Sequence, residues 1–150
     1  MSGPRIRVGA LVVNGGRILL VRHEKDGRAY WLLPGGGVEE GEQLEDAMRR
    51  EFAEECGLAV RSLQGPIAMA ETIPPADVPD GRHILHMIFA LDPAPHGNEQ
   101  PTSVDSAVLG HAFVDRSRLH ELELRPPIHD FLVGYRPGDP FVSLGRMWIS

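Results

Sequence analysis

The chain has 150 residues, of which 42% are hydrophobic and 24% are charged, as is typical of a globular protein. Its formal net charge of -6 argues against non-specific nucleic-acid binding, because such binding depends on Lys and Arg displacing counterions from phosphate. Cys56 is the single cysteine, which excludes an intramolecular disulfide and a multi-cysteine zinc site. Without a leader-like segment or an apolar stretch of about 18 residues, we expect a cytoplasmic protein with no membrane partner, formed by residues 1–150 as one domain.

The first part of the sequence predicts a β-hairpin followed by a short strand. Residues 6–13 and 18–23 are apolar and rich in β-branched side chains, and Asn14-Gly15-Gly16 between them is a strong hairpin signal. Residues 30–33 predict a short strand. Pro34 and the three glycines after it should end that strand in a glycine-rich turn.

A helix is predicted for residues 43–56, because Gly57 suits a helix C-terminus and acidic residues occupy the first turn. After the helix, strands are expected at residues 58–73 (interrupted by Gly65-Pro66), 82–91 and 107–114. Short helices are expected at 115–122 and 126–135, and the apolar tail 141–149 should form a terminal strand or an extension packed on a neighbour. This order of elements predicts an α/β (α+β) domain.

The predicted helix carries carboxylates where its pattern requires apolar side chains. At about 100° per residue, one face of the helix forms an apolar stripe of Leu44, Ala47, Met48 and Phe52. Glu51 and Glu55 fall within this stripe, and Glu54 lies at its edge beside Arg50. Burying an unpaired carboxylate costs several kcal/mol, so two of them should not lie there without a counter-charge.

Two interpretations of these glutamates are open. In the first, the ends of the helix protrude and the glutamates are solvated or paired with Arg49 and Arg50, as runs of charge usually are. In the second, the cluster of hard oxygen ligands binds Mg²⁺ or Mn²⁺, ions that bridge carboxylates to substrate phosphates. The stripe geometry and the preceding glycine-rich loop favour the metal site.

Residues 36–58 resemble the Nudix box, whose pattern is G-x5-E-x7-R-E-U-x-E-E-x-G-U with U a bulky aliphatic residue. Every fixed position is filled, by Gly36, Glu42 and the run Arg50-Glu51-Phe52-Ala53-Glu54-Glu55-Cys56-Gly57-Leu58, although Phe52 is aromatic. Weaker similarity covers residues 18–22, 31–36 and 112–119. The chain thus resembles the Nudix (MutT-like) hydrolase family, which implies the Nudix fold, a central mixed β-sheet sandwiched between helices.

The resemblance implies an enzyme that cleaves a phosphoanhydride bond in a nucleoside diphosphate linked to a further group, X. Metal ions would neutralise the diphosphate oxygens and activate a water, and a carboxylate would accept the proton of that water. By their positions in the box, the expected ligands of Mg²⁺ or Mn²⁺ are Glu51, Glu54, Glu55 and the carbonyl group of Gly36.

The remaining box positions imply supporting roles. Arg50 should orient a glutamate through a charge-assisted hydrogen bond, and Glu42 should tie the loop to the helix. Glu39 is assigned either to metal binding or to structure. For the general base the first choice is Glu51, and the candidates outside the box are Glu99 and Asp105.

Outside the box, the candidate substrate contacts are Arg22, Tyr30, Trp31 and His86. Each has a structural alternative: a solvated strand arginine, aromatic packing in the core, or a surface histidine. His83 and His86 lie on opposite faces of one strand, so they cannot share a metal. The loops at 73–81 and 93–103 have the length and composition of specificity loops.

The sequence predicts a nucleotide-type small-molecule substrate but does not select it. Nucleoside triphosphates, ADP-ribose and other nucleotide sugars, and dinucleoside polyphosphates all fit, with a preference for a triphosphate or an ADP-sugar because the compact chain shows no extra substrate domain. The alternative of another class is a Nudix-fold nucleotide-sensing module, against which the complete box argues. Isomerase chemistry would need other acid and base residues, and RNA decapping fits the acidic charge poorly. A homodimer through the N-terminal strand or the apolar tail stays open.

Overall fold

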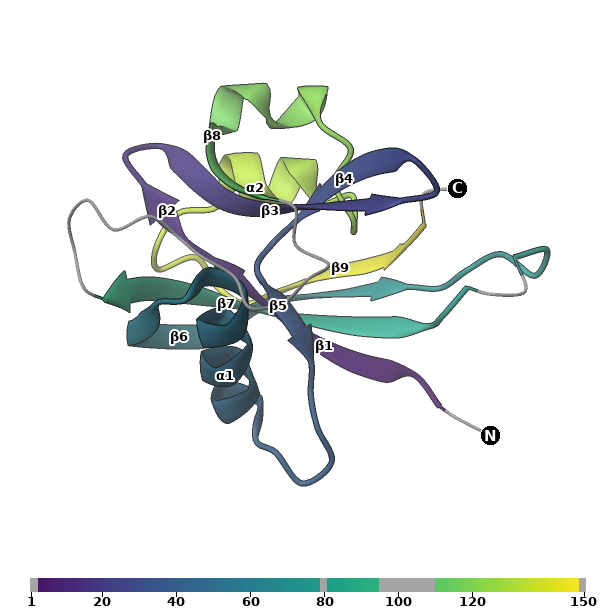
Figure 1. Ribbon diagram of the computed structural model, residues 1–150, viewed down its shortest axis with the longest axis horizontal. Helices are drawn as coiled ribbons and strands as arrows, with labels where there is room; N and C mark the ends of the chain where they lie inside the picture. Colours follow the sequence, from purple (N-terminus) through teal and green to yellow (C-terminus); the bar gives the residue numbers. More distant parts are fainter. Residues whose placement is uncertain (1–2, 79–80, 95–109, 149–150) are drawn as a thin grey trace.

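A computed structural model describes residues 3–78, 81–94 and 110–148. The strands form a five-stranded mixed sheet and a four-stranded sheet. The long helix α1 (Leu44–Cys56) covers one face of the five-stranded sheet, and the second sheet and two short helices lie over the other face (Figure 1). The expected α/β fold, with a mixed sheet between helical elements, is confirmed.

The N-terminal strands include the predicted hairpin, but the chain changes sheets before it. β1 (Arg5–Leu11) belongs to the five-stranded sheet, whereas β2 (Val13–Asn14) and β3 (Arg17–Lys25) pair antiparallel in the other sheet. Gly15 and Gly16 make the turn with φ values of 59° and 80°, which glycine adopts without strain. The single strand predicted for residues 6–13 is therefore divided at Val12.

After β4 (Arg28–Leu32), the glycines that follow Pro34 do not form the predicted turn. They form a short edge strand, β5 (Gly35–Gly37), which pairs antiparallel with β1. A Cβ atom on Gly35 would overlap the Val8 carbonyl oxygen, so this close backbone approach requires glycine. The prediction of a turn was wrong because it treated glycine as a strand breaker and ignored close pairing at a sheet edge.

Helix α1 begins one residue later than predicted and ends as predicted. Gly57 has a φ of 68°, and its N–H donates to the Ala53 carbonyl oxygen at 2.9 Å, which closes the helix with a left-handed cap. Ala47, Met48 and Phe52 are fully buried against the five-stranded sheet. The predicted apolar stripe is confirmed.

The strands after α1 lie close to their predicted positions. β6 (Ala59–Thr72) is a single strand, but its pairing with β7 (Ile84–Ala94) shifts register between Gln64 and Ala68. The interruption predicted at Gly65-Pro66 is therefore found in the ladder and does not end the strand. An irregularity inside the strand thus accommodates the proline. β8 (Gly110–Asp115) is the described part of the strand predicted for residues 107–114, of which 107–109 lie outside the described residues.

The C-terminal part contains two short helices and a strand. η1 (Arg116–Glu121) is a 3-10 helix capped by the Asp115 side chain, which accepts a hydrogen bond from the Ser117 N–H at 2.9 Å. α2 (His129–Gly134) begins later than the predicted residue 126, because Pro126 lies in a tight turn in which its carbonyl oxygen accepts from the Ile128 N–H at 2.9 Å. β9 (Val142–Met147) pairs parallel with β6, so the apolar tail forms a terminal strand.

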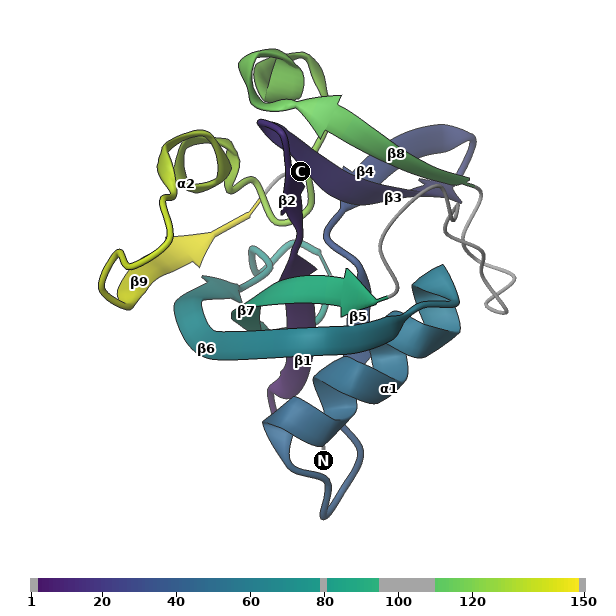
Figure 2. The same ribbon diagram turned by 90° about the vertical axis from the view of Figure 1, so that its left-hand side faces the viewer.

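The five-stranded sheet, in the order β5-β1-β7-β6-β9, separates two apolar cores (Figure 2). Val8 and Phe89 pack with α1 on one face, whereas Leu11 and Ile88 face the second sheet and the short helices. Because side chains alternate along a strand, Arg7 of β1 lies on the same face as Leu11, between the two sheets. In the described part of the chain, no helix is both long and apolar enough to cross a membrane.

Candidate metal and nucleotide site

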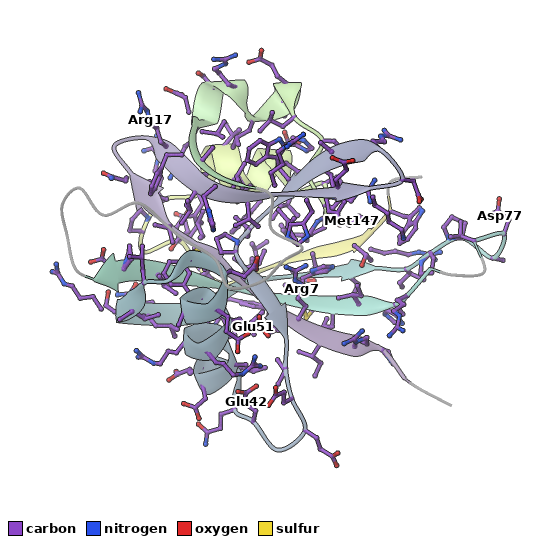
Figure 3. All side chains as sticks on the ribbon, viewed as in Figure 1. Arg7, Arg17, Glu42, Glu51, Asp77 and Met147 are labelled. Atoms are coloured by element: carbon purple, nitrogen blue, oxygen red, sulfur yellow. The ribbon has the colours of Figure 1, made fainter. Side chains whose placement is uncertain are left out.

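Glu51 extends from α1 toward the glycine strand β5, as Figure 3 shows. Its side chain is 15% exposed, so most of it is withdrawn from water. A Cβ atom on Gly36 would overlap the Glu51 carboxylate, and the glycine therefore leaves the space that this carboxylate occupies. The helix carboxylate and the glycine backbone are thus in direct contact.

Glu55 is the most deeply buried of the helix glutamates, with 2% of its side chain exposed. Its Oε1 accepts a hydrogen bond from the Gly35 N–H at 2.7 Å, and its Oε2 lies 3.8 Å from the His23 Nε2. The Nε2 atom of His111 lies 2.6 Å from the Glu55 backbone oxygen, within hydrogen-bond distance. Glu55 is therefore held from β5 and from both β3 and β8 of the second sheet.

Glu54 differs from the other two glutamates because 47% of its side chain is exposed. Its Oε2 lies 3.6 Å from Arg50 Nη1, as its position at the edge of the apolar stripe predicts. An exposed carboxylate on a long side chain can change rotamer at little cost. Glu54 is thus the most adjustable of the helix carboxylates.

Arg50 connects the loop before α1 to the helix. Its Nε and Nη2 atoms each donate to Glu42 at 2.8 Å, Nη2 also donates to the Gly37 carbonyl oxygen at 3.0 Å, and Nη1 donates to Glu51 at 2.8 Å. Glu42 in turn accepts from the Glu39 N–H at 3.1 Å. Arg50 contacts Glu51 more closely than it contacts Glu54, although the sequence places it four residues before Glu54.

The charges around α1 shift several pKa values. The hydrogen bonds from Arg50 lower the pKa of Glu42 to about 2. Burial raises the pKa of Glu51, against the opposing effect of Arg50 and Arg7. Burial, with the nearby Glu55 carboxylate, raises the pKa of Cys56 to about 12, so this thiol stays protonated and packs as a small core residue.

In the present side-chain arrangement, no group of three or more His, Cys, Asp or Glu among the described residues is placed to hold a metal ion. The donor chemistry nevertheless fits a hard divalent cation, because three carboxylates share one face of α1 beside the Gly36 backbone. The raised pKa of Glu51 marks a carboxylate that lacks sufficient positive charge around it. A rotation of the exposed Glu54 side chain would bring a further oxygen toward the other two.

A cleft of about 520 Å³ lies between the two sheets and contains two of the four predicted substrate contacts, Tyr30 and His86. Trp31 instead packs against the apolar core, which is the structural alternative for this residue. Arg22, opposite Trp31 in the pairing of β3 with β4, is not among the residues that line the cleft. Glu99 and Asp105, the candidate bases outside the box, lie outside the described residues.

Several cleft residues were not predicted from the sequence, namely Arg7, His23, Thr72 and Arg125. None of them belongs to a spaced motif, and they come from β1, β3, β6 and the segment after η1. For Arg7 a usable signal exists, because a charged residue at an inward position of an apolar strand is unusual. The other three give no signal of this kind.

The comparisons with known proteins identify the family of this chain. Residues 3–133 match the NUDIX domain, and the chain belongs to this family. Over 92 residues it is 33% identical to an ADP-ribose pyrophosphatase of Methanocaldococcus jannaschii, an alignment that covers 59% of this chain and 51% of that protein. Over 93 residues it is 34% identical to the nucleoside triphosphatase NudI of Escherichia coli, covering 57% of this chain and 66% of that protein. The chain thus spans about half to two thirds of the length of these curated relatives.

Solved structures show the same fold. A MutT NUDIX hydrolase from Burkholderia pseudomallei superposes with a TM-score of 0.63 at 28% identity, covering 77% of this chain and 86% of that one. A MutT protein from Bacillus halodurans gives a TM-score of 0.71 over 94% of this chain and 89% of that one. At 16% identity the second likeness concerns the fold alone.

Proposed function

We propose that this protein is a divalent-metal-dependent pyrophosphohydrolase that cleaves a phosphoanhydride bond of a nucleoside diphosphate linked to a further group. The observation that carries the proposal is the contact between α1 and β5. There Glu51 and Glu55 are withdrawn from water beside a backbone in which Gly36 leaves space for a carboxylate. Ordinary helices do not bury carboxylates in an apolar stripe, so this arrangement supports a role for them in binding a cation.

Glu51, Glu54 and Glu55, with the carbonyl oxygen of Gly36, are the residues that would hold Mg²⁺ or Mn²⁺. Such an ion, when bound, supplies charge neutralisation for phosphate oxygens and acidifies water. The chain contributes the positioning of these ligands. Arg50 fixes Glu51 at 2.8 Å and the loop through Glu42, which keeps the ligands in place before the substrate arrives.

Glu51 is our first choice for the general base that accepts a proton from water. Its carboxylate lies between α1 and β5, against Gly36. Glu99 and Asp105 remain the alternatives for this role. Burial raises the pKa of Glu51, which favours acceptance of a proton.

The relatives support a nucleotide as the substrate. One relative is named as an ADP-ribose pyrophosphatase and another as a nucleoside triphosphatase. Both names describe hydrolysis at a phosphoanhydride bond of a nucleotide. We therefore propose a nucleoside triphosphate or an ADP-sugar as the substrate class of this chain.

The test is hydrolysis of a nucleotide panel by the wild-type protein and by Glu54→Gln. The panel contains the nucleoside triphosphates, ADP-ribose, other nucleotide sugars and dinucleoside polyphosphates, each with Mg²⁺, and released phosphate, pyrophosphate and nucleoside monophosphate are measured. We expect Glu54→Gln to lower turnover by about 10²-fold or more, because one charged ligand is lost, while the exposed site leaves the unfolding midpoint unchanged.

The matched control is Glu45→Gln, the same chemical change at an exposed position in the first turn of α1. It should leave turnover unchanged. Metal-dependent hydrolysis at the wild-type rate in both Glu54→Gln and Glu55→Gln would refute the site assignment. If the wild-type protein hydrolyses no member of the panel but binds one of them tightly, the protein is a nucleotide sensor and the proposal is wrong.

A further inference from the structure

The last turn of α1 carries two of the three helix glutamates and has no basic side chain of its own. The negative end of the helix dipole lies there, which is unfavourable for the carboxylates of Glu54 and Glu55. The carbonyl groups of a last turn also lack partners within the helix. This end of α1 therefore depends on hydrogen-bond donors from outside the helix.

Two of these carbonyl groups have donors in the structure. The Gly57 N–H donates to the Ala53 carbonyl oxygen at 2.9 Å, within the cap of the helix itself. The Glu55 carbonyl oxygen lies 2.6 Å from the His111 Nε2 atom. Because a carbonyl oxygen only accepts, Nε2 must carry a hydrogen and act as the donor. His111 thus supplies from β8 a cap that the sequence of α1 does not provide.

His111 reaches α1 from the second sheet. It is opposite Val21 in the pairing of β8 with β3, and His23 lies two residues further along β3, so the three side chains share one face of that sheet. The His23 Nε2 lies 3.8 Å from the Glu55 Oε2. The same face of the second sheet therefore meets Glu55 at two points, at its carboxylate and at its backbone oxygen.

Apolar contacts hold the rest of α1. Met48 and Phe52 are fully buried and pack in one cluster with Phe89 of β7. Contacts of this kind are non-directional, so they keep the helix on the sheet without fixing the distance between particular atoms. A hydrogen bond does fix such a distance. The bond from His111 thus sets the spacing between the last turn of α1 and the second sheet.

The position of this last turn matters for a cation shared between the helix carboxylates. Glu51 and Glu55 are four residues apart and lie on one face of α1. Arg50 holds the Glu51 carboxylate at 2.8 Å, and the Gly35 N–H donates to the Glu55 Oε1 at 2.7 Å. Mg²⁺ demands a nearly fixed arrangement of its oxygen ligands, so a displaced last turn weakens binding.

We propose that His111 is a positioning residue for the metal ligands of α1. Its hydrogen bond to the Glu55 carbonyl oxygen holds the last turn against the second sheet and keeps the Glu55 carboxylate in place to bind a divalent cation. This role rests on the proposed function, because it requires Glu55 to be a metal ligand. His111 acts through Glu55 and contacts neither the cation nor the substrate.

The test is binding of Mn²⁺ without nucleotide, measured by electron paramagnetic resonance of the free ion. Gln and Asn carry the same amide, but only Gln places its nitrogen where the His Nε2 lies, since Asn is one carbon shorter. We expect His111→Asn to weaken Mn²⁺ binding about tenfold, as the loss of a partner of a metal ligand does, and His111→Gln to retain nearly wild-type affinity. Glu54→Gln should also weaken binding, which assigns the titrated ion to α1.

His129→Asn is the matched control, because the His129 Nε2 lies 2.9 Å from the Leu122 carbonyl oxygen and makes the same kind of bond away from α1. We expect it to lower the melting temperature and to leave Mn²⁺ affinity unchanged. His111→Leu is a second variant without the donor. The loss of one hydrogen bond is small against the stability of a domain, so these variants should fold, and thermal unfolding verifies this.

Two results would overturn the role of His111. One is wild-type Mn²⁺ affinity in the folded variants His111→Asn and His111→Leu. The other is equal weakening in His111→Gln and His111→Asn, which would assign the effect to the imidazole ring and not to the hydrogen bond. Both results leave the proposed function intact, provided that the wild type binds Mn²⁺ and Glu54→Gln binds it less tightly. Absence of Mn²⁺ binding by the wild type would contradict the proposed function, and the role of His111 with it.

Discussion

Gly36 is the residue at which the backbone of the site and its chemistry are in closest contact. Adding a Cβ atom there would displace the Glu51 carboxylate. We expect Gly36→Ala to lower turnover by about 10²-fold, because a misplaced ligand misaligns the reacting groups. The measurement is the hydrolysis rate with saturating Mg²⁺, together with urea unfolding to verify that the variant is folded.

The neighbouring residue provides the control for this prediction. A Cβ atom on Gly37 would meet only the Arg5 Nη2 at 3.6 Å, an ordinary contact with the end of a flexible side chain. Gly37→Ala should therefore keep nearly full activity. Equal activity in the two alanine variants would show that the Gly36 position does not set the placement of Glu51.

His86 gives the protein a pH-dependent stability. Burial, with the positive charge of Arg7 nearby, lowers its pKa from the usual 6.5 to about 4 in the folded protein, so the folded state disfavours the protonated ring. Above pH 6.5 the neutral ring makes its full contribution to the free energy of unfolding. As the pH falls from 6.5 to 4, the free energy of unfolding decreases by at most about 1.4 kcal/mol per pH unit. Denaturant unfolding at several pH values should show this decline.

His86→Gln should flatten the decline between pH 6.5 and pH 4, because the amide does not titrate. His120→Gln serves as the comparison, since 61% of the His120 side chain is exposed. A decline of unchanged steepness in His86→Gln would assign the pH dependence to other groups.

The candidate site residues of the box could be predicted from the sequence, whereas only some of the residues that line the cleft could be. Glu51 and Glu55 interrupt the apolar stripe of the helix, and the sequence alone is enough to recognise this interruption. Tyr30 and His86 were expected near the substrate and do line the cleft, whereas Trp31 packs in the core. Arg125 and His23 acquire their positions only from pairing between distant segments, which no local spacing encodes.

At the scale of elements, the Arg50 side chain connects β5 and the loop before α1 to the helix. Arg50 donates to Glu42, to the Gly37 carbonyl oxygen and to Glu51. Arg50→Lys keeps a positive charge but cannot make this set of planar contacts. We expect a fall in the melting temperature of roughly 5 °C and a clear loss of turnover, both measured against the wild type.

Arg49→Lys tests whether this effect belongs to the contacts of Arg50 or to any arginine on the helix. Arg49 is its exposed neighbour on α1. Arg49→Lys should leave both the melting temperature and turnover unchanged. If the two variants melt at the same temperature, the link between loop and helix does not contribute measurably to stability.

The elements themselves were predictable to different degrees. The hairpin and α1 follow local signals, a glycine turn and a 3.6-residue periodicity with a glycine cap, and both are found close to their expected places. β5 was missed because its pairing with β1 depends on a distant strand that accepts a glycine backbone at close range. The break in the pairing of β6 with β7 between Gln64 and Ala68 was predictable from Gly65-Pro66, but the continuation of the strand beyond it depends on β7 and was not.

At the scale of the whole molecule, the division of the strands between two sheets could not be predicted from the sequence. β1 and β2 are separated by Val12 alone, yet they belong to different sheets. Hydrophobic alternation reports which face of a strand is buried, but not which partner covers it. The cleft lies between the two sheets and therefore could not be predicted from the sequence alone.

This alternation has a consequence for how the protein can fold. The chain contributes β1 to one sheet, β2 to β4 to the other, β5 to β7 to the first again, β8 to the second and β9 to the first. The five-stranded sheet needs both ends of the chain, because β1 and β9 both belong to it, and the second sheet is completed only after β5 to β7 of the first have been made. We therefore expect the two sheets to form together, at a rate limited by non-local pairings such as β1 with β7 and β3 with β8.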